Sequence, residues 1–261
     1  MHPTLQLALR AARSVGEHYE YLLDRLDLAR TDNTLDELLA NCSKRVEQAI
    51  ERQLVRAHPD ASLRGRRIQL EGSGELCWEI DSLVGEANLR RGYPAFALSI
   101  AIYQRDRLEQ VILFNPATEQ EFMASRGRGA TLNGRRIRVL QGWKSEQAAL
   151  ALPQPARAQR KALLPDYLKL VEHFNTAQLL ASGCAALDIC AVAAGQLDAG
   201  VFLGAETEQL APALLILKEA GGLSGDLNGS PQLGEQGRLL VTNPKAFRQL
   251  DSQLKPLLSN P

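Results

Sequence analysis

The order of segments in this 261-residue sequence predicts a layered protein in which an α+β part is followed by an α/β part. Two helical stretches open the chain, short strands separated by tight turns come next, and strands then alternate with helices. The length suffices for one large domain or for two closely associated ones. We therefore expect an N-terminal α+β subdomain over residues 1–145 and a C-terminal α/β subdomain over residues 146–261.

The two opening stretches are expected to form helices over residues 3–27 and 34–57. In the second stretch, apolar residues recur at steps of three and four, which is the spacing of one helix face. Pro59 follows it. Because the residue before a proline is pushed out of the helical region, we expect this helix to end near His58.

Short apolar runs bounded by turn signals predict a series of strands after the second helix. A proline-containing turn at residues 115–118 and the tight-turn dipeptide Asn133-Gly134 separate some of these runs. Together they favour helices packed on a largely antiparallel sheet. The expected strands lie at residues 78–80, 96–103, 108–114, 120–126 and 136–140.

In the second half of the chain, strand and helix patterns alternate. Gly195 closes one small-residue helix, and a glycine pair at residues 221–222 closes another, as is typical of helix C-caps. This alternation indicates an α/β subdomain. The expected strands lie at residues 148–153, 197–203 and 238–243, and the expected helices at residues 158–173, 182–195, 210–222 and the C-terminus.

Composition excludes several classes of protein. Thirty basic and thirty acidic residues cancel, so no overall charge attracts nucleic acid, although a local patch remains open. No apolar run approaches the roughly 18 residues that cross a bilayer, and the N-terminal stretch lacks the apolar core of a secretory signal. The four cysteines and four histidines are scattered rather than paired at metal-ligand spacing. We expect a cytoplasmic protein with free thiols and no membrane segment.

The segments WEIDSLVGEAN, EFMASRGRGATLNGRRIRV, SGCAALDICAVAAGQLDAG and LKEAGGLSGDLNG occur in this order along the chain. Together they resemble motifs of the inositol monophosphatase family, particularly of its bacterial SuhB type. The first segment, WEIDSLVGEAN, is similar to the family signature W-x-I-D-P-L-D-G-T-T-N. The resemblance covers nearly the whole chain and implies the αβαβα sandwich of that family. The four segments are residues 78–88, 121–139, 182–200 and 217–229.

By resemblance, the signature segment should carry the metal chemistry of the family. Family members hydrolyse phosphate monoesters with a magnesium-activated water, and these ions require oxygen ligands. Asp81 stands at the first aspartate of the signature, and the Leu83 carbonyl could still point at a metal. Val84 replaces the second aspartate and has no ligating atom. Glu86 replaces the threonine that orients the attacking water.

Other positions at which the family places chemistry are also changed. An aspartate of the second helix falls on Ser43, and the aspartate of a late W-D pair falls on Gln209. The glutamate offered to the inositol ring falls on Phe202. Because one carboxylate cannot hold two magnesium ions, we expect only a remnant metal site at Asp81 and Leu83. The degenerate positions, at which we expect no catalytic residue, are Ser43, Arg66, Val84, Glu86 and Gln209.

The glutamate turn of the family metal site can be placed in two registers. One puts it on residues 65–67, so that Arg66 stands where a metal ligand would be, and the other puts it on Glu71. Asp81 is accordingly interpreted either as a relict ligand or as an ion-pair partner of Arg66 or Arg67. In the ion-pair case, Arg66 would replace the charge of the metal.

The phosphate-binding turn of the family is altered as well. Gly85 preserves the turn before a helix whose positive end would face a phosphate. Glu86 places a carboxylate at that end, and we expect it to cap the helix and to compete with phosphate. A remnant of the substrate pocket would consist of Gly85, Glu86 and Phe202.

Two arginine-rich stretches remain after these assignments. The first is expected to be solvated surface, with a binding site for RNA or an acidic partner as the alternative. The second resembles a segment that the family carries as ordinary structure, with a basic strip as the alternative. The first stretch comprises residues 64–67, and the second contains Arg126, Arg128, Arg135, Arg136 and Arg138.

These substitutions favour a pseudo-phosphatase: a catalytically impaired family member with a binding or regulatory role and no expected cofactor. SuhB-type proteins act in transcription antitermination, so the resemblance implies a Nus-factor-like protein partner and a homodimer, without direct binding of nucleic acid. One alternative is a residual Mg²⁺-dependent phosphatase acting on inositol phosphate or another small phosphate monoester. Another alternative is a sensor that binds a small anion without hydrolysis.

Overall fold

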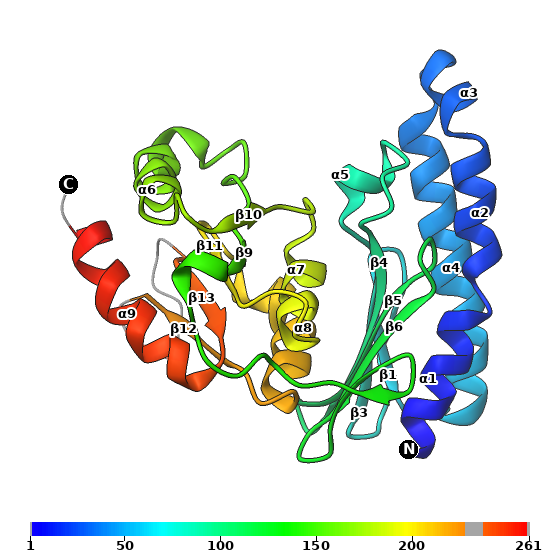
Figure 1. The fold of residues 1–261 in the computed structure, drawn as a ribbon. Coiled ribbons are helices and arrows are strands. Elements are labelled where there is room, and N and C mark those ends of the chain that lie inside the picture. Colours follow the sequence, from blue (N-terminus) through cyan, green and yellow to red (C-terminus); the bar gives the residue numbers. More distant parts are fainter. Residues whose placement is uncertain (1, 228–236, 260–261) are drawn as a thin grey trace. The chain divides into compact units, whose positions relative to one another are not determined.

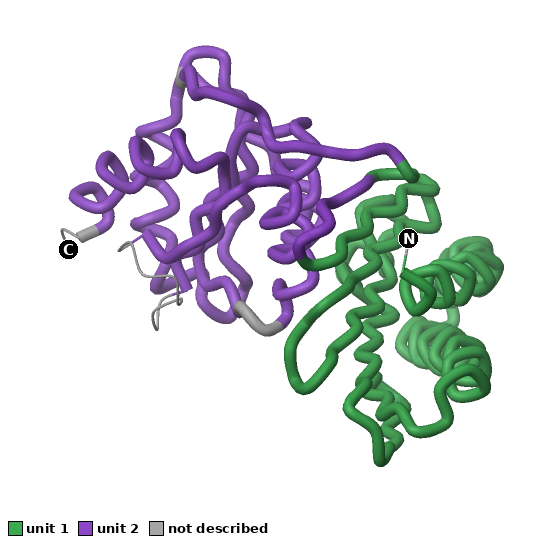
Figure 2. The backbone as a smooth tube through the Cα atoms, turned by 90° about the horizontal axis from the view of Figure 1, so that it is seen from below, with its two compact units in different colours: residues 1–126, 132–134 green, residues 127–131, 135–261 purple. Residues whose placement is uncertain are grey.

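The computed structural model describes residues 2–227 and 237–259 of the chain. The chain divides into two compact units, which Figure 2 shows in different colours. Unit 1 comprises residues 1–126 and 132–134, and unit 2 comprises residues 127–131 and 135–261. The last motif segment of the sequence, residues 217–229, extends at Asn228 and Gly229 beyond the described residues.

The helices of unit 1 differ from the prediction at the N-terminus. The expected helix over residues 3–27 is wrong, because the helix breaks after Arg13 and restarts at Gly16. The Ser14 hydroxyl donates to the Ala11 carbonyl (2.8 Å), which favours a turn over a further helical residue. The long helix does end at Ala57, immediately before His58-Pro59, as predicted. The helices are α1 (Pro3–Arg13), α2 (Gly16–Asp24), α3 (Leu26–Thr31), α4 (Leu35–Ala57) and α5 (Glu86–Leu89).

The first sheet contains the predicted strands together with shorter ones that the pattern missed. Its order is β2-β1-β3-β4-β5-β6-β7-β8, and apart from the parallel pair β1–β3 the registered pairs are antiparallel. The expected strand at 78–80 is longer than predicted, and that at 136–140 is reduced to two residues. The strands are β1 (Ser62–Arg64), β2 (Gln69–Leu70), β3 (Leu76–Val84), β4 (Ala97–Gln104), β5 (Arg107–Asn115), β6 (Gln120–Ser125), β7 (Gly129–Leu132) and β8 (Arg135–Arg136).

Helices α1, α2 and α4 cover one face of this sheet in unit 1 (Figure 1). Apolar side chains of the helices and strands form one buried cluster between them, which includes Leu22, Ile50, Trp78 and Phe96. Tyr19 is fully buried in the same layer, and its hydroxyl donates to the Ser82 carbonyl (2.7 Å). Burial raises the pKa of this phenol well above its usual value, so the hydroxyl stays a donor. This bond ties α2 to the end of β3.

Unit 2 is an α/β layer structure, as the alternation of strands and helices predicted. Its five-stranded sheet has the order β10-β9-β11-β13-β12, with β10, β9 and β11 parallel and β13 antiparallel to both neighbours. Figure 1 shows α7 and α8 on one face of this sheet and α6 and α9 on the other.

The bounds of the elements in unit 2 are as follows. A 3₁₀ turn, η1 (Ser145–Gln147), precedes the first strand. The strands are β9 (Ala149–Ala151), β10 (Gln178–Leu180), β11 (Ala199–Phe202), β12 (Leu223–Asp226) and β13 (Leu239–Thr242), and the helices are α6 (Arg160–His173), α7 (Ala185–Ala193), α8 (Thr207–Glu219) and α9 (Pro244–Ser259).

Within the described part of the chain, no helix is both long enough and apolar enough to span a bilayer.

Candidate functional site

The signature segment leaves the sheet at a β-bulge. The pairing of β3 with β4 is regular up to Asp81, opposite Ser99, and resumes only at Val84, opposite Ala97. The bulge is fixed locally, because the Leu83 amide donates to Asp81 Oδ1 (3.0 Å). Gly85 follows with a φ of 77°, a left-handed conformation that suits glycine, and α5 starts at the next residue.

The guanidinium of Arg66 occupies the space beside this bulge. Its Nε donates to Asp81 Oδ1 (2.7 Å), and its Nη1 donates to Glu86 Oε2 (3.0 Å). Its Nη2 reaches the Leu83 carbonyl (3.4 Å). The expected ion pair between Asp81 and Arg66 is therefore confirmed. Three oxygen atoms of the signature segment thus accept hydrogen bonds from one guanidinium.

The charge of Arg66 is secured by its surroundings. Partial burial lowers the pKa of the guanidinium, but the hydrogen bonds and charges of Asp81 and Glu86 outweigh that effect, so the pKa is raised overall. The side chains of this group are 32–44% exposed, so solvent weakens each ion pair taken alone. The fork of the guanidinium nevertheless fixes the positions of two carboxylates at once.

Arg66 is held at the tip of the β1–β2 hairpin by a buried carboxylate from α4. Glu47 is fully buried and accepts the backbone amides of Arg66 (3.2 Å) and Arg67 (2.7 Å). The hairpin itself is closed by the Gly65 amide, which donates to the Ile68 carbonyl (2.8 Å). A Cβ on Gly65 would lie 2.6 Å from Glu47 Oε2, so the close approach of loop and carboxylate requires glycine.

The hydroxyls of Ser43 and Ser82 complete the environment of Glu47. They donate to Glu47 Oε1 over 3.0 Å and 2.9 Å, and the two hydroxyl oxygens lie 2.7 Å apart. Both serines are buried. The carboxylate thus receives four hydrogen bonds, which is how a buried charge without a cationic neighbour is stabilised. Ser43, one of the degenerate positions, belongs to this anchor and not to the group around Arg66.

Glu47 is the residue of this site that the sequence interpretation missed. It lies four residues after Ser43 and beside Val46 on the buried face of α4, together with Ile50. An acidic residue on the apolar face of an amphipathic helix is a detectable signal, because a buried carboxylate needs partners. Glu71, the rival candidate for the glutamate turn, is exposed and accepts a hydrogen bond from Gln69 (3.2 Å).

The expected carboxylate cap at Glu86 is wrong. No side chain caps the start of α5, and Glu86 instead bridges two arginines. Its Oε2 accepts Arg66, and its Oε1 accepts Arg90 Nε (3.0 Å) one helical turn later. Arg90 also pairs with Asp36 (2.6 Å). Two cations within reach of one carboxylate outcompete the short α5 backbone for its oxygens.

The remaining predicted positions lie in unit 2, apart from Val84, which contributes only apolar atoms. Phe202 ends β11 and is buried, with its ring folded back over Gly200, where a Cβ would lie 2.6 Å from the ring. Gln209, in the first turn of α8, donates to the Glu206 carboxylate.

Metal-ligating side chains do not gather in threes in residues 2–227 and 237–259. No group of three or more histidines, cysteines, aspartates or glutamates is positioned there to hold a metal ion.

Comparison with solved structures defines the class of protein. The chain resembles the SuhB extragenic suppressor protein of Bartonella henselae with a TM-score of 0.81, at 22% identity over 97% of this chain and 99% of that one. It resembles an inositol monophosphatase (IMPase) of Thermotoga maritima with a TM-score of 0.79, at 21% identity over 99% of both chains. These likenesses show the fold and confirm the predicted layered α/β class.

The sequence comparisons are more specific. The sequence model of the inositol monophosphatase family matches residues 1–257, and the chain belongs to this family. The Nus factor SuhB of Pseudomonas aeruginosa is 37% identical over 265 residues, covering 99% of this chain and 98% of that protein. The Nus factor SuhB of Escherichia coli is 30% identical, covering 100% of this chain and 98% of that protein.

The anchor can be tested by replacing Glu47 with glutamine. An amide offers one acceptor oxygen in place of two and places an NH₂ group against at least one backbone amide donor, so we expect the free energy of unfolding to fall by about 2–3 kcal/mol. Urea denaturation measures this change. Glu51→Gln, one turn further along α4, is the matched control and should leave stability nearly unchanged. Equal stability of the two variants would contradict the role of Glu47.

Proposed function

We propose that this protein is a pseudo-phosphatase that acts as a Nus-type factor in transcription antitermination through contacts with proteins. The observation that carries the first half of this proposal is the position of Arg66. Its guanidinium takes up Asp81, Glu86 and the Leu83 carbonyl, which are the oxygen donors nearest the signature bulge. The fold is kept, while these oxygen atoms accept hydrogen bonds from Arg66.

The side chains at this position do not fit Mg²⁺. A hard divalent cation needs several free oxygen ligands in near-octahedral geometry, and it is repelled by a guanidinium. The Val84 side chain has no oxygen atom, and the Glu47 carboxylate already accepts hydrogen bonds from two amides and two hydroxyls. The proposal therefore includes the absence of a magnesium cofactor.

The phosphate side of the site supports the same conclusion. Glu86 stands at the start of α5, and its charge is balanced by Arg66 and Arg90. A phosphate monoester arriving at that helix end would meet this carboxylate and two arginines that are already paired. Binding would require it to break existing ion pairs, so the proposal excludes hydrolysis as the main function.

The second half of the proposal is supported by the relatives. Proteins named Nus factor SuhB match the whole length of this chain at 30–37% identity. A role that depends on binding other proteins needs the fold but not the reaction. We further propose that the protein acts in the cytoplasm, as a homodimer, with another transcription protein as its partner.

The enzymatic alternative is tested by an assay with inositol-1-phosphate and a generic phosphate ester under Mg²⁺ titration. We expect no Mg²⁺-dependent turnover above background, because the ligands are absent or occupied. The Asp81→Ala variant should behave like the parent, and an active family member serves as the positive control. Turnover that Asp81→Ala abolishes would establish a residual phosphatase instead.

The transcription role is tested in a purified antitermination assay with RNA polymerase and Nus factors of Pseudomonas aeruginosa from which the resident SuhB is omitted. We expect this protein to restore terminator readthrough, and Asp81→Ala to restore it equally, because the role does not use catalysis. A readthrough level equal to that without added protein would contradict the proposal.

A further inference from the structure

The arginine-rich segment at residues 126–138 is only partly explained by the fold. Arg126 has a structural role, because its Nε and Nη2 donate to the Leu108 carbonyl (3.0 and 2.7 Å). Arg128, Arg136 and Arg138 are exposed and form no ion pair with any of the residues that the structure describes. We call these three residues the arginine cluster. They take no part in the group around Arg66.

The backbone that carries Arg128 is held rigidly. Glu219, at the end of α8, accepts the Gly127 amide with Oε1 and the Gly129 amide with Oε2, both over 2.8 Å. Both glycines have positive φ angles (70° and 87°), so the turn between them needs residues without a Cβ. Arg128 lies between the two bound amides. Its side chain is therefore presented from a fixed turn.

The other two arginines lie along the same structure. A Cβ on Gly129 would be 2.8 Å from Arg136 Nη2, and a Cβ on Gly221, two residues after Glu219, would be 3.6 Å from Arg138 Nη1. The Val139 amide donates to the Ala220 carbonyl (3.2 Å), which fixes the segment after β8 beside the end of α8. Arg136 thus lies against the turn that carries Arg128, and Arg138 lies against the turn that follows Glu219.

The charge of the cluster is not neutralised by its immediate neighbours. The Glu219 carboxylate, which accepts two neutral amides, offsets only one of the three positive charges, and the adjacent Lys218 is exposed and adds a further one. The chain as a whole has no net charge. A local positive excess on a neutral protein is a specific feature of this surface, and it attracts anions over short range.

We propose that the arginine cluster binds the phosphodiester backbone of a single-stranded nucleic acid. Phosphates repeat along such a chain, and each offers oxygens that match the planar fork of a guanidinium. Guanidiniums at separate positions along one segment suit a chain of repeating phosphates better than one small anion. This inference goes beyond the proposed function and does not depend on it.

The exposed surface of the segment favours a nucleic acid over an acidic protein. The exposed residues at 127–138 are arginines, glycines and one asparagine, with no exposed large apolar side chain among them. Protein interfaces draw their energy from buried aromatic and apolar anchors, which this segment lacks. A binding surface made of arginine and backbone is typical of contacts to phosphates.

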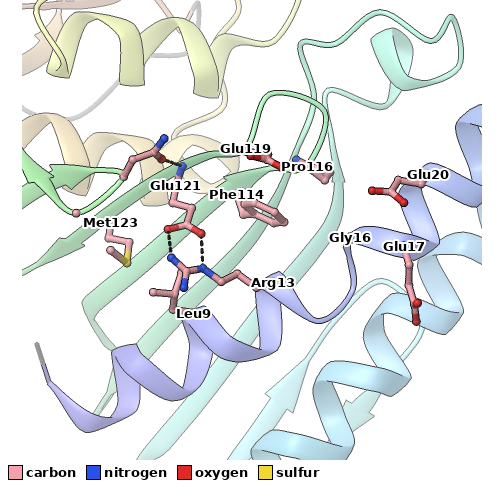
Figure 3. Close-up of a pocket in the computed structure, with 12 residues that line it drawn as sticks. Leu9, Arg13, Gly16, Glu17, Glu20, Phe114, Pro116, Glu119, Glu121 and Met123 are labelled. Carbon is pink, nitrogen blue, oxygen red and sulfur yellow. Dashed lines mark hydrogen bonds and ion pairs between the residues drawn. The ribbon is translucent and has the colours of Figure 1, made fainter.

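Unit 1 also contains a cavity between α1 and the strands β5 and β6 (Figure 3). It has a volume of about 630 Å³ and an apolar wall that includes Leu9, Phe114 and Met123. Its one buried charge, Glu121, is already bound by both Nε and Nη2 of Arg13 (2.5 and 2.8 Å). No buried polar atom of this cavity is left for a ligand, so it carries no proposal.

The test is fluorescence anisotropy with a labelled single-stranded oligonucleotide of mixed sequence, prepared as RNA and as DNA. We expect the logarithm of the association constant to fall linearly with the logarithm of salt concentration. The expected slope is about −2, since three contacts to a single strand contribute about −0.7 each. The triple variant Arg128→Gln, Arg136→Gln, Arg138→Gln should weaken binding by tenfold or more and flatten the slope.

The control variant is Arg56→Gln, Arg157→Gln, Arg248→Gln, which removes the same charge from exposed arginines elsewhere and should bind like the parent. Circular dichroism checks folding, and if the triple variant is unfolded, Arg128→Gln alone should still weaken binding. Equal weakening by the control, unchanged binding by the cluster variants, or equal affinity for polyglutamate at the same salt concentration would overturn the proposal. Preference for RNA or for DNA identifies the source of the phosphates.

Discussion

The site depends on one internal cation. Arg66 places its guanidinium beside the bulge at the end of β3, where it donates to Asp81, Glu86 and the Leu83 carbonyl. A guanidinium is permanently charged and covalently tethered, so it needs no concentration of free ion to stay in place. The loop between β3 and α5 is thereby ordered by the chain itself.

The tether works because the backbone beneath Arg66 is equally constrained. Glu47 binds the two amides at the hairpin tip, the hydroxyls of Ser43 and Ser82 satisfy the same carboxylate, and Gly65 leaves room for it. Glu219 does the same at the turn that presents Arg128. In both places a single carboxylate accepts two loop amides and fixes a turn that carries an arginine. Arg66 is paired with two carboxylates, whereas Arg128 forms no ion pair with the residues that the structure describes.

Much of this was readable in the sequence. The fold class, the end of α4 before His58-Pro59 and the pairing of Arg66 with Asp81 followed from periodicity, from proline sterics and from the substitution of a cation at a ligand position. The role of Glu47 did not, because an acid on the buried face of α4 indicates that it needs partners but does not show that the loop at residues 65–67 supplies them. The break after Arg13 depended on a local hydroxyl–carbonyl bond, and the orientation of Glu86 depended on two arginines from different elements. The first is settled by a local side-chain hydrogen bond and the second by tertiary contacts, and helix propensity predicts neither.

The most direct measurement is isothermal titration calorimetry of Mg²⁺ into the parent protein and into the double variant Arg66→Glu, Val84→Asp. The variant removes the tethered cation and returns two carboxylates beside Asp81, and thermal unfolding verifies that it is folded. We predict no saturable Mg²⁺ binding by the parent and measurable binding by the variant. Tight, stoichiometric binding of Mg²⁺ by the parent, abolished by Asp81→Ala, would contradict the account.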